Sequence, residues 1–188
     1  MKIKLKNCAR LVCAISMSVM TCISPLSQAQ IFSPSHIKAN HNLLIQYLAQ
    51  ERLYAGLQSK TLTIGDVTWS YSEGGAKSKP TILLIHGLAG TRDNWNRVAQ
   101  FLTPYYHVII PDLPTNGDTK TPSNFDFSVP NVTSELRLFL ETLGFEKNLH
   151  IAGHSLGGSI AMVYASQYPF DTQSLFLIET SVITFAFS

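Results

Sequence analysis

The sequence predicts an α/β protein built on a mainly parallel sheet with helices on both faces. Two observations support this class. Short apolar runs rich in β-branched residues alternate along the chain with longer segments whose apolar residues recur at helical spacing. The runs at 81–85 and 107–110 are continuously apolar, as strands buried on both faces require, rather than alternating. Successive parallel strands then need right-handed crossovers through the intervening helices.

Residues 1–29 are predicted to be a removable signal peptide, and residues 30–188 to form a single domain. Four basic residues open the chain, Leu11 to Ile23 is mostly apolar, and Ser27-Gln28-Ala29 offers a small-residue cleavage site. The apolar run is shorter than the roughly 20 residues of a spanning helix, so we expect no stable span and export to the periplasm or the exterior. Two alternatives stay open, a retained N-terminal anchor and a lipid anchor on Cys22.

Charge and cysteine content exclude several classes of function. Removing the leader takes 4 of the 14 basic residues and none of the 12 acidic ones, which leaves 10 minus 12, or −2. Nothing resembling a basic stripe remains for nucleic acid or an anionic membrane. All three cysteines lie in the leader, so the rest of the chain has no thiol for a disulfide, a metal or catalysis. His36 and His41 are spaced wrongly to share a metal, and we expect no metal and no cofactor.

The first half of the domain is predicted to contain one helix, a hairpin, and two buried strands separated by a second helix. The hairpin is indicated by two β-rich runs that flank Gly65-Asp66. In order, the expected elements are a helix over 36–57, antiparallel strands over 61–64 and 67–71, a strand over 81–85, a helix over 93–102 and a strand over 107–110.

The second half opens with a long loop and then returns to alternating helices and strands. Prolines and a glycine exclude regular structure from 113–124. The next helix begins at Ser128 to Pro130, carries an apolar stripe of 3.6-residue period, and ends before Gly144 in the left-handed cap position. The remaining expected elements are a strand from 149 into Gly153, a helix over 156–168 that Pro169 stops, and an apolar strand over 174–178.

The stretch from Leu149 to Gly158, which reads L-H-I-A-G-H-S-L-G-G, places Ser155 on the turn between a strand and a helix. This is the G-x-S-x-G pattern of a nucleophile elbow. Gly153 and Gly157 give the clearance that such a cramped turn requires. The N–H of Leu156 at the helix start has no helical partner, so it is expected to point toward the negative charge that develops on the substrate when the serine attacks. The alternative is a glycine-rich turn whose serine only caps the helix.

The order of motifs resembles the α/β-hydrolase fold superfamily, and within it the bacterial exported lipases and esterases. The motifs are His86-Gly87 after one strand, Pro111-Asp112 after the next, and the elbow after a third. The resemblance implies an acyl-enzyme formed on Ser155 from a small-molecule or lipid ester. It also implies an oxyanion hole made by the backbone N–H groups of Leu88 and Leu156. Oligomeric state is not predicted.

The family pattern is incomplete at the C-terminus of this chain. The family order is serine, acid, histidine, and no histidine follows Ser155. We therefore expect a C-terminally truncated α/β-hydrolase domain with impaired catalysis. The existing histidines are expected in other roles, with His86 bracing its loop and His154 projecting away from the serine. Glu179 follows the last strand, where some hydrolases carry their acid, but it is expected to be a solvated strand end.

Two other functions remain open at this point. The chain could be a non-catalytic fragment or pseudoenzyme, arising from an interrupted gene, with at most a binding role. Alternatively, the same fold could carry another reaction, such as that of a haloperoxidase or a C–C hydrolase, since a fold does not determine its chemistry.

Overall fold

The computed structural model describes residues 34–114 and 116–180. The predicted signal peptide and its cleavage site lie outside these residues. The chain divides into two compact units, 1–47 and 48–188. Helix α3, which includes the described part of the first unit, runs from Pro34 to Tyr54. None of the helices among the described residues is long and apolar enough to cross a membrane.

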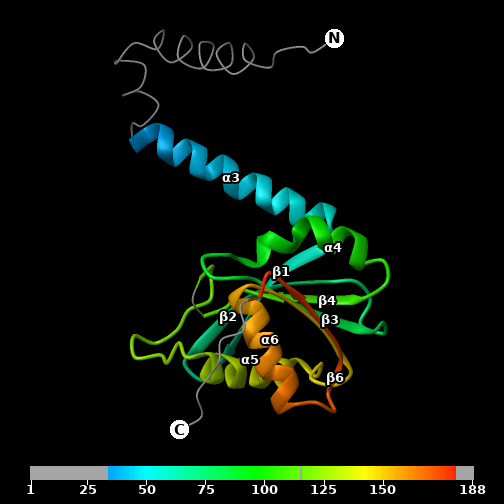
Figure 1. The fold of residues 1–188 in the computed structure, drawn as a ribbon. Helices are drawn as coiled ribbons and strands as arrows, with labels where there is room; N and C mark the ends of the chain where they lie inside the picture. Colours follow the sequence, from blue (N-terminus) through cyan, green and yellow to red (C-terminus); the bar gives the residue numbers. More distant parts are fainter. Residues whose placement is uncertain (1–33, 115, 181–188) are drawn as a thin grey trace, which may run out of the picture. The chain divides into compact units, whose positions relative to one another are not determined.

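Among the described residues of the second unit, six strands form one mixed sheet, in the order β1-β2-β4-β3-β5-β6 (Figure 1). β1 and β2 are antiparallel to their neighbours, whereas β4, β3, β5 and β6 are parallel. The predicted fold class is therefore confirmed. The strands are β1 (Leu57–Ile64), β2 (Val67–Gly74), β3 (Thr81–Ile85), β4 (His107–Pro111), β5 (Leu149–His154) and β6 (Thr172–Ile178).

Helices cover both faces of the sheet, as predicted. The helical elements of this unit are η1 (Arg92–Trp95), α4 (Asn96–Leu102), α5 (Val129–Leu143) and α6 (Leu156–Gln167). Gly144 ends α5 with φ +77°, in the predicted left-handed cap. Two expectations are wrong in detail. The helix expected over 36–57 ends at Tyr54, and β1 begins at Leu57, before the strand expected over 61–64. The segment expected as one helix from 93 begins with a 3₁₀ turn. Thr91 caps that turn, accepting a hydrogen bond from the Asp93 N–H at 3.3 Å.

The two faces of the sheet carry separate hydrophobic clusters. Because side chains alternate along a strand, Leu83 and Ile109 point to one face while Leu84 and Val108 point to the other. The first face packs against α5 and α6, and the second packs against η1 and α4. Both faces of β3 and β4 are thus covered, which explains their continuously apolar sequences.

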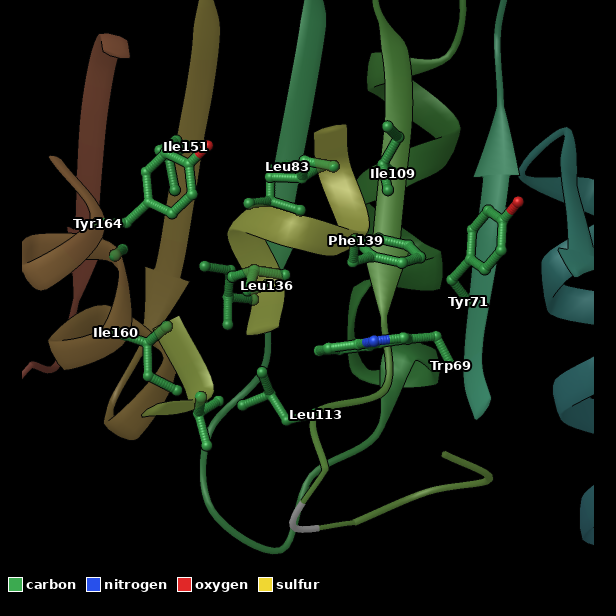
Figure 2. Packing of buried hydrophobic residues seen from close by; sticks show 14 of the residues in the cluster. Trp69, Tyr71, Leu83, Ile109, Leu113, Leu136, Phe139, Ile151, Ile160 and Tyr164 are labelled. Atoms are coloured by element: carbon green, nitrogen blue, oxygen red, sulfur yellow. The ribbon is translucent and has the colours of Figure 1, made fainter. Parts of the chain in front are cut away.

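Phe139 of α5 lies at the centre of the larger cluster (Figure 2). Its ring stacks on Trp69 with centroids 4.9 Å apart and meets the Tyr71 ring edge-on at 5.1 Å. All three rings are buried. They attach α5 to β2, the strand that lies between the hairpin edge and the parallel part of the sheet.

Replacing Phe139 with alanine should lower the free energy of unfolding by about 3–5 kcal/mol, since it removes buried apolar surface and leaves a cavity between two aromatic rings. Urea denaturation measures this difference. Phe170→Ala is the matched control, because Phe170 is 98% exposed and its loss should change stability by less than about 0.5 kcal/mol. Equal losses in the two variants would contradict this packing.

β6 is an edge strand with much of its apolar surface exposed. Its neighbour β5 is largely buried, whereas Leu175, Phe176 and Leu177 of β6 are 38%, 65% and 39% exposed. Within the described residues, β6 pairs on one side only, with β5. An uncharged apolar strand with a free edge is the part of a sheet most prone to pair with another polypeptide.

Candidate active site

Ser155 lies at the junction of β5 and α6, on the strand-to-helix turn that the sequence predicts. Its backbone has φ +51° and ψ −118°, a conformation that residues other than glycine rarely adopt. The Ser155 N–H donates to the carbonyl oxygen of Ile178 at 3.0 Å, and the Ser155 carbonyl accepts from the Gly158 N–H at 3.0 Å. The serine side chain makes no capping hydrogen bond to α6. The helix-cap alternative is therefore not what the structure shows.

The glycines of the elbow are required by close backbone contacts. A Cβ atom on Gly153 would collide with the carbonyl of Gly157, and one on Gly157 would collide with the carbonyls of Ile85 and His86. β5, α6 and the end of β3 therefore approach one another more closely than any side chain allows. This packing holds the turn in its strained form.

The His86-Gly87 loop after β3 lies directly against the serine. A Cβ atom on Gly87 would be 3.2 Å from Cβ of Ser155, so this loop and the elbow are in contact. Leu88, the expected source of one oxyanion-hole N–H, follows at once, and its side chain is 70% exposed. Leu156 begins α6, so its N–H belongs to the first turn of a helix, whose amides have no helical partner. The two expected backbone donors thus come from segments that meet at Ser155.

Unusual backbone conformations are concentrated around this point. Four described non-glycine residues have positive φ, and three of them follow the carboxyl ends of adjacent parallel strands. These three are Ala89 after β3, Ser155 after β5 and Glu179 after β6, with φ of 59°, 51° and 47°. Such conformations cost of order 1–3 kcal/mol each, and they cluster at functional sites.

His86 braces the loop, as predicted, and its two ring nitrogens are both occupied. Nε2 accepts the Leu113 N–H at 2.9 Å, and Nδ1 lies 2.8 Å from the Gly87 carbonyl oxygen. An acceptor at Nε2 and a carbonyl at Nδ1 require the neutral ring with its proton on Nδ1. The ring is 1% exposed, and this burial lowers the pKa of His86 despite the hydrogen bond to Gly87. His86 therefore ties the loop after β3 to the loop after β4.

Because the pKa of His86 lies below 6.5 in the folded state, the unfolded chain binds its proton first as the pH falls. The free energy of unfolding should decrease below pH 6.5, by at most about 1.4 kcal/mol per pH unit from this residue. Urea denaturation of the wild type and His86→Gln between pH 7.5 and 5 tests this. The wild type should show the steeper decrease, and parallel curves would contradict the assignment.

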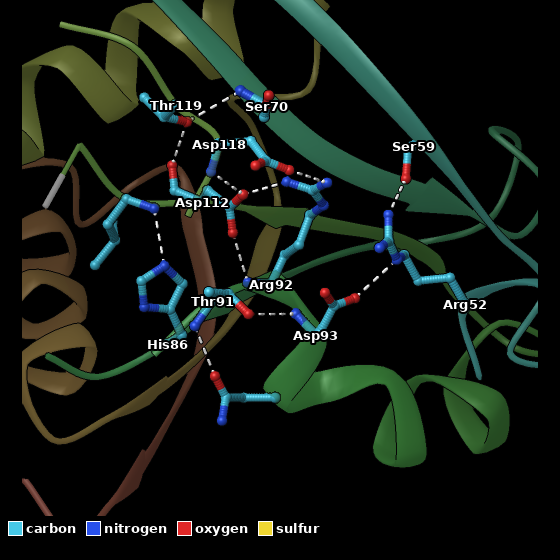
Figure 3. Close-up of polar contacts among 12 residues, drawn as sticks. Arg52, Ser59, Ser70, His86, Thr91, Arg92, Asp93, Asp112, Asp118 and Thr119 are labelled. Carbon is cyan, nitrogen blue, oxygen red and sulfur yellow. Dashed lines mark hydrogen bonds and ion pairs between the residues drawn. The ribbon is translucent and has the colours of Figure 1, made fainter. Parts of the chain in front are cut away.

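A buried ion pair ties the same two loops together a second time (Figure 3). Arg92 donates to Asp112 through its guanidinium Nη1 and through its backbone N–H, the latter at 2.7 Å. Asp112 also accepts the Asp118 N–H at 2.9 Å, and Thr119 Oγ1 donates to the Asp112 carbonyl oxygen at 2.8 Å. Asp112 is 1% exposed. Its carboxylate is held by Arg92 and by the Asp118 N–H, so Asp112 braces its loop.

Arg92 and Gly117 were not singled out from the sequence, although both are needed here. The Arg92 guanidinium also pairs with Asp118 at 2.8 Å. Gly117 has φ +78°, and a Cβ atom there would collide with the Asp112 carboxylate. The only sequence signal was the dense run of turn residues after Pro111, which marks a loop but does not reveal what it contacts.

The described residues near Ser155 contain one histidine–carboxylate pair. His154 Nε2 lies 3.6 Å from Glu179 Oε2, with side-chain exposures of 46% and 85%. His154 Nδ1 lies on the opposite side of the ring, against Gly87. His154 therefore lies between the Glu179 carboxylate and the Gly87 backbone. The remaining histidines of the second unit, His107 and His150, lie at the beginnings of β4 and β5, at the far end of the sheet. No cluster of three potential metal ligands occurs among the described residues.

Comparison with known proteins identifies the family. Residues 80–186 match the family model described as the alpha/beta hydrolase fold. This chain belongs to the α/β-hydrolase fold family. The matched region contains β3, the elbow and β6, which are the described segments that meet at Ser155.

Relatives and solved structures give a consistent picture. Lipase 1 of Psychrobacter immobilis is 38% identical over 140 residues, which are 73% of this chain and 43% of that lipase. A crystal structure described as a candidate lipase from Acinetobacter baumannii AYE is 63% identical, has a TM-score of 0.71, and is matched over 72% of this chain and 46% of its own. A membrane phospholipase A structure is 32% identical with a TM-score of 0.73, over 96% of this chain and 55% of its own. This chain spans less than half the length of the first two.

Proposed function

We propose that this chain carries the nucleophile and the oxyanion hole of an exported serine ester hydrolase of the lipase type. Ser155 Oγ would attack the ester carbonyl, and the N–H groups of Leu88 and Leu156 would stabilise the oxyanion. The observation that carries the proposal is the strained turn of Ser155 packed against the His86-Gly87 loop. The similarity to Lipase 1 and to the phospholipase supports an ester or lipid substrate over other reactions of the fold.

The base of this reaction is proposed to come from residues other than the 188 of this chain. A serine nucleophile needs a base within hydrogen-bond reach and a group that orients the base. His86 is buried and has both nitrogens occupied, and His154 is directed toward Glu179 and Gly87. The exposed apolar edge of β6 offers a place where a further strand could pair. The histidine-bearing segment would join the sheet on that side.

Export also remains a proposal. It rests on the basic and apolar leader of residues 1–29 and is supported by the membrane phospholipase A among the similar structures. N-terminal sequencing of the protein recovered from the periplasm or medium of a bacterial culture would test it. A mature chain that starts at Gln30 supports cleavage, whereas an intact Met1 on membrane-bound protein would favour the retained anchor.

Labelling with a fluorophosphonate tests the nucleophile directly. In the chain extended by the segment that follows the matched region in the Acinetobacter protein, which would supply the base, we expect the probe to be attached to the peptide that contains Ser155, as mass spectrometry of the digested protein would show. Ser155→Ala should abolish the labelling. Ser134→Ala is the matched control, because Ser134 is exposed on α5 and its hydroxyl donates only to the Pro130 carbonyl at 3.0 Å. Labelling that survives Ser155→Ala would overturn the assignment.

A further inference from the structure

The fold gathers lysines at the end of the sheet opposite Ser155. The sequence predicts no basic stripe, and the net charge of residues 30–188 is −2. Nevertheless, four of the six lysines in residues 34–180 line two hollows, one beside β1 and the end of β2 and the other at the amino ends of β3 and β5. These four are Lys60, Lys77, Lys79 and Lys147. Positive charge is therefore concentrated locally in a chain that is mildly acidic as a whole.

The smaller hollow, of about 180 Å³, is neutralised by the protein itself. Glu73, which is 6% exposed, lies in its wall and pairs with Lys60 at 2.6 Å and with Lys77 at 3.5 Å. His107 Nε2 lies 2.7 Å from the same carboxylate. Burial alone would raise the pKa of Glu73, but the hydrogen bonds from Lys60 and His107 outweigh it and lower that pKa. These lysines already have an anionic partner.

The larger hollow, of about 500 Å³, has no such partner. Lys79 and Lys147 lie on its wall from two different loops, and no Asp or Glu is among the described residues that line it. Neither ammonium group forms an ion pair with a carboxylate in the described part of the chain. The other lining side chains are hydroxyls, amides and an imidazole, apart from Pro80. A hollow with two cations and several hydrogen-bond donors is suited to an anion.

Parts of this hollow are held in place by neighbouring contacts. Lys79 Nζ donates to the Pro104 carbonyl at 2.6 Å, which uses one of its three N–H groups and leaves two. His150 Nδ1 bonds to Ser174 Oγ at 2.8 Å, and its ring meets the edge of Tyr106 with centroids 5.5 Å apart. Asn148 has φ +54°, so the loop that carries Lys147 makes a tight turn at this point. The donor groups therefore need little rearrangement to bind a ligand.

We propose that this hollow binds a phosphate group, with Lys79 and Lys147 as its two cationic contacts. A phosphate monoester carries about −1.5 to −2 charges at pH 7 and offers three oxygen acceptors, which match two ammonium groups surrounded by hydroxyl and amide donors. The phosphate could be free in solution or belong to a phospholipid headgroup. The site lies at the amino ends of the strands, so it is separate from the ester site at their carboxyl ends.

Titration of the chain with inorganic phosphate, followed by NMR, tests the site. The ionic strength is held constant with chloride, because screening weakens exposed charge pairs. We expect saturable shifts of the backbone amides of Lys79, Lys147 and Asn148. In the double variant K79Q/K147Q the affinity should fall about tenfold or more, since two charge contacts are lost. K38Q/K120Q is the matched control, because it removes two exposed lysines that lie outside the hollow and should leave the affinity unchanged.

Sedimentation with vesicles of phosphatidylcholine, with or without phosphatidic acid, whose headgroup is a phosphate monoester, separates the two sources of phosphate. Saturable phosphate binding that the double variant loses supports a free phosphate ligand. Binding only to the vesicles that contain phosphatidic acid, again lost in the double variant and retained in the control, supports a headgroup. Absence of both kinds of binding, or equal binding by K79Q/K147Q and K38Q/K120Q, would overturn the proposal. Neither result depends on esterase activity, so the outcome is independent of the function proposed for Ser155.

Discussion

Replacing Asp112 with alanine should cost about 3–5 kcal/mol in the free energy of unfolding, because it leaves a buried guanidinium without its carboxylate. The Arg92 and Asp112 side chains are only 7% and 1% exposed. The variant also loses the hydrogen bonds that Asp112 accepts from the Arg92 and Asp118 N–H groups. Denaturation in urea measures the loss.

Asp118→Ala is the matched control for this prediction. Asp118 pairs with the same guanidinium at 2.8 Å, but its side chain is 72% exposed. Exposed ion pairs contribute about 0–1 kcal/mol, so this variant should remain close to the wild type. If the two variants lost equal stability, the buried pair would not be what holds the two loops together. A loss below about 1 kcal/mol for Asp112→Ala would lead to the same conclusion.

The second large effect concerns the missing base. We expect the 188-residue chain to hydrolyse p-nitrophenyl butyrate very slowly, since removing the base of a serine triad costs on the order of a million-fold in turnover. Oxyanion stabilisation and substrate binding alone should leave a rate roughly a thousand times that of the uncatalysed reaction in water. Extending the chain after residue 180 with the segment that follows the matched region in the Acinetobacter protein should restore the rate. The expected gain in kcat is on the order of 10⁵ to 10⁶.

Two variants of the extended protein complete the test. Ser155→Ala should return the rate to that of the 188-residue chain, whereas Ser134→Ala should have no effect. Glu179→Gln distinguishes an internal base, because it would lower the activity of the 188-residue chain only if His154 acted with Glu179. A rate for the 188-residue chain within about a hundredfold of the extended protein would show that the base lies inside this chain. In that case His154 becomes the first candidate.

Much of the fold follows from local sequence patterns. Gly144 marks the end of α5 because a left-handed backbone conformation costs least at glycine, and the structure shows Gly144 at φ +77°. The apolar runs of β3 and β4 predict burial on both faces, and both strands are covered. Ser155 was predicted on its turn because glycines at 153 and 157 are needed where a strand and a helix meet.

Contacts between distant segments could not be predicted in the same way. Arg92 and Asp112 are 20 residues apart, and no periodicity relates them. The lysines at 79 and 147 face one hollow only because β3 and β5 are neighbours in the sheet, and that neighbour relation is set by crossover topology rather than by local propensity. The exposure of β6 likewise depends on its edge position, since its apolar sequence alone predicts burial.

The sequence by itself determined the alternation of strands and helices, the elbow at Ser155 and the absence of a histidine after it, because these depend on residue type and short-range spacing. The tertiary structure decided which polar side chains have hydrogen-bond or ion-pair partners. His86 and Asp112 are held by partners from other loops. Lys79 and Lys147 share a hollow whose described lining residues include no carboxylate. The physical reason is that burial and pairing arise from elements packed across the sheet, whose contacts join residues far apart in the chain.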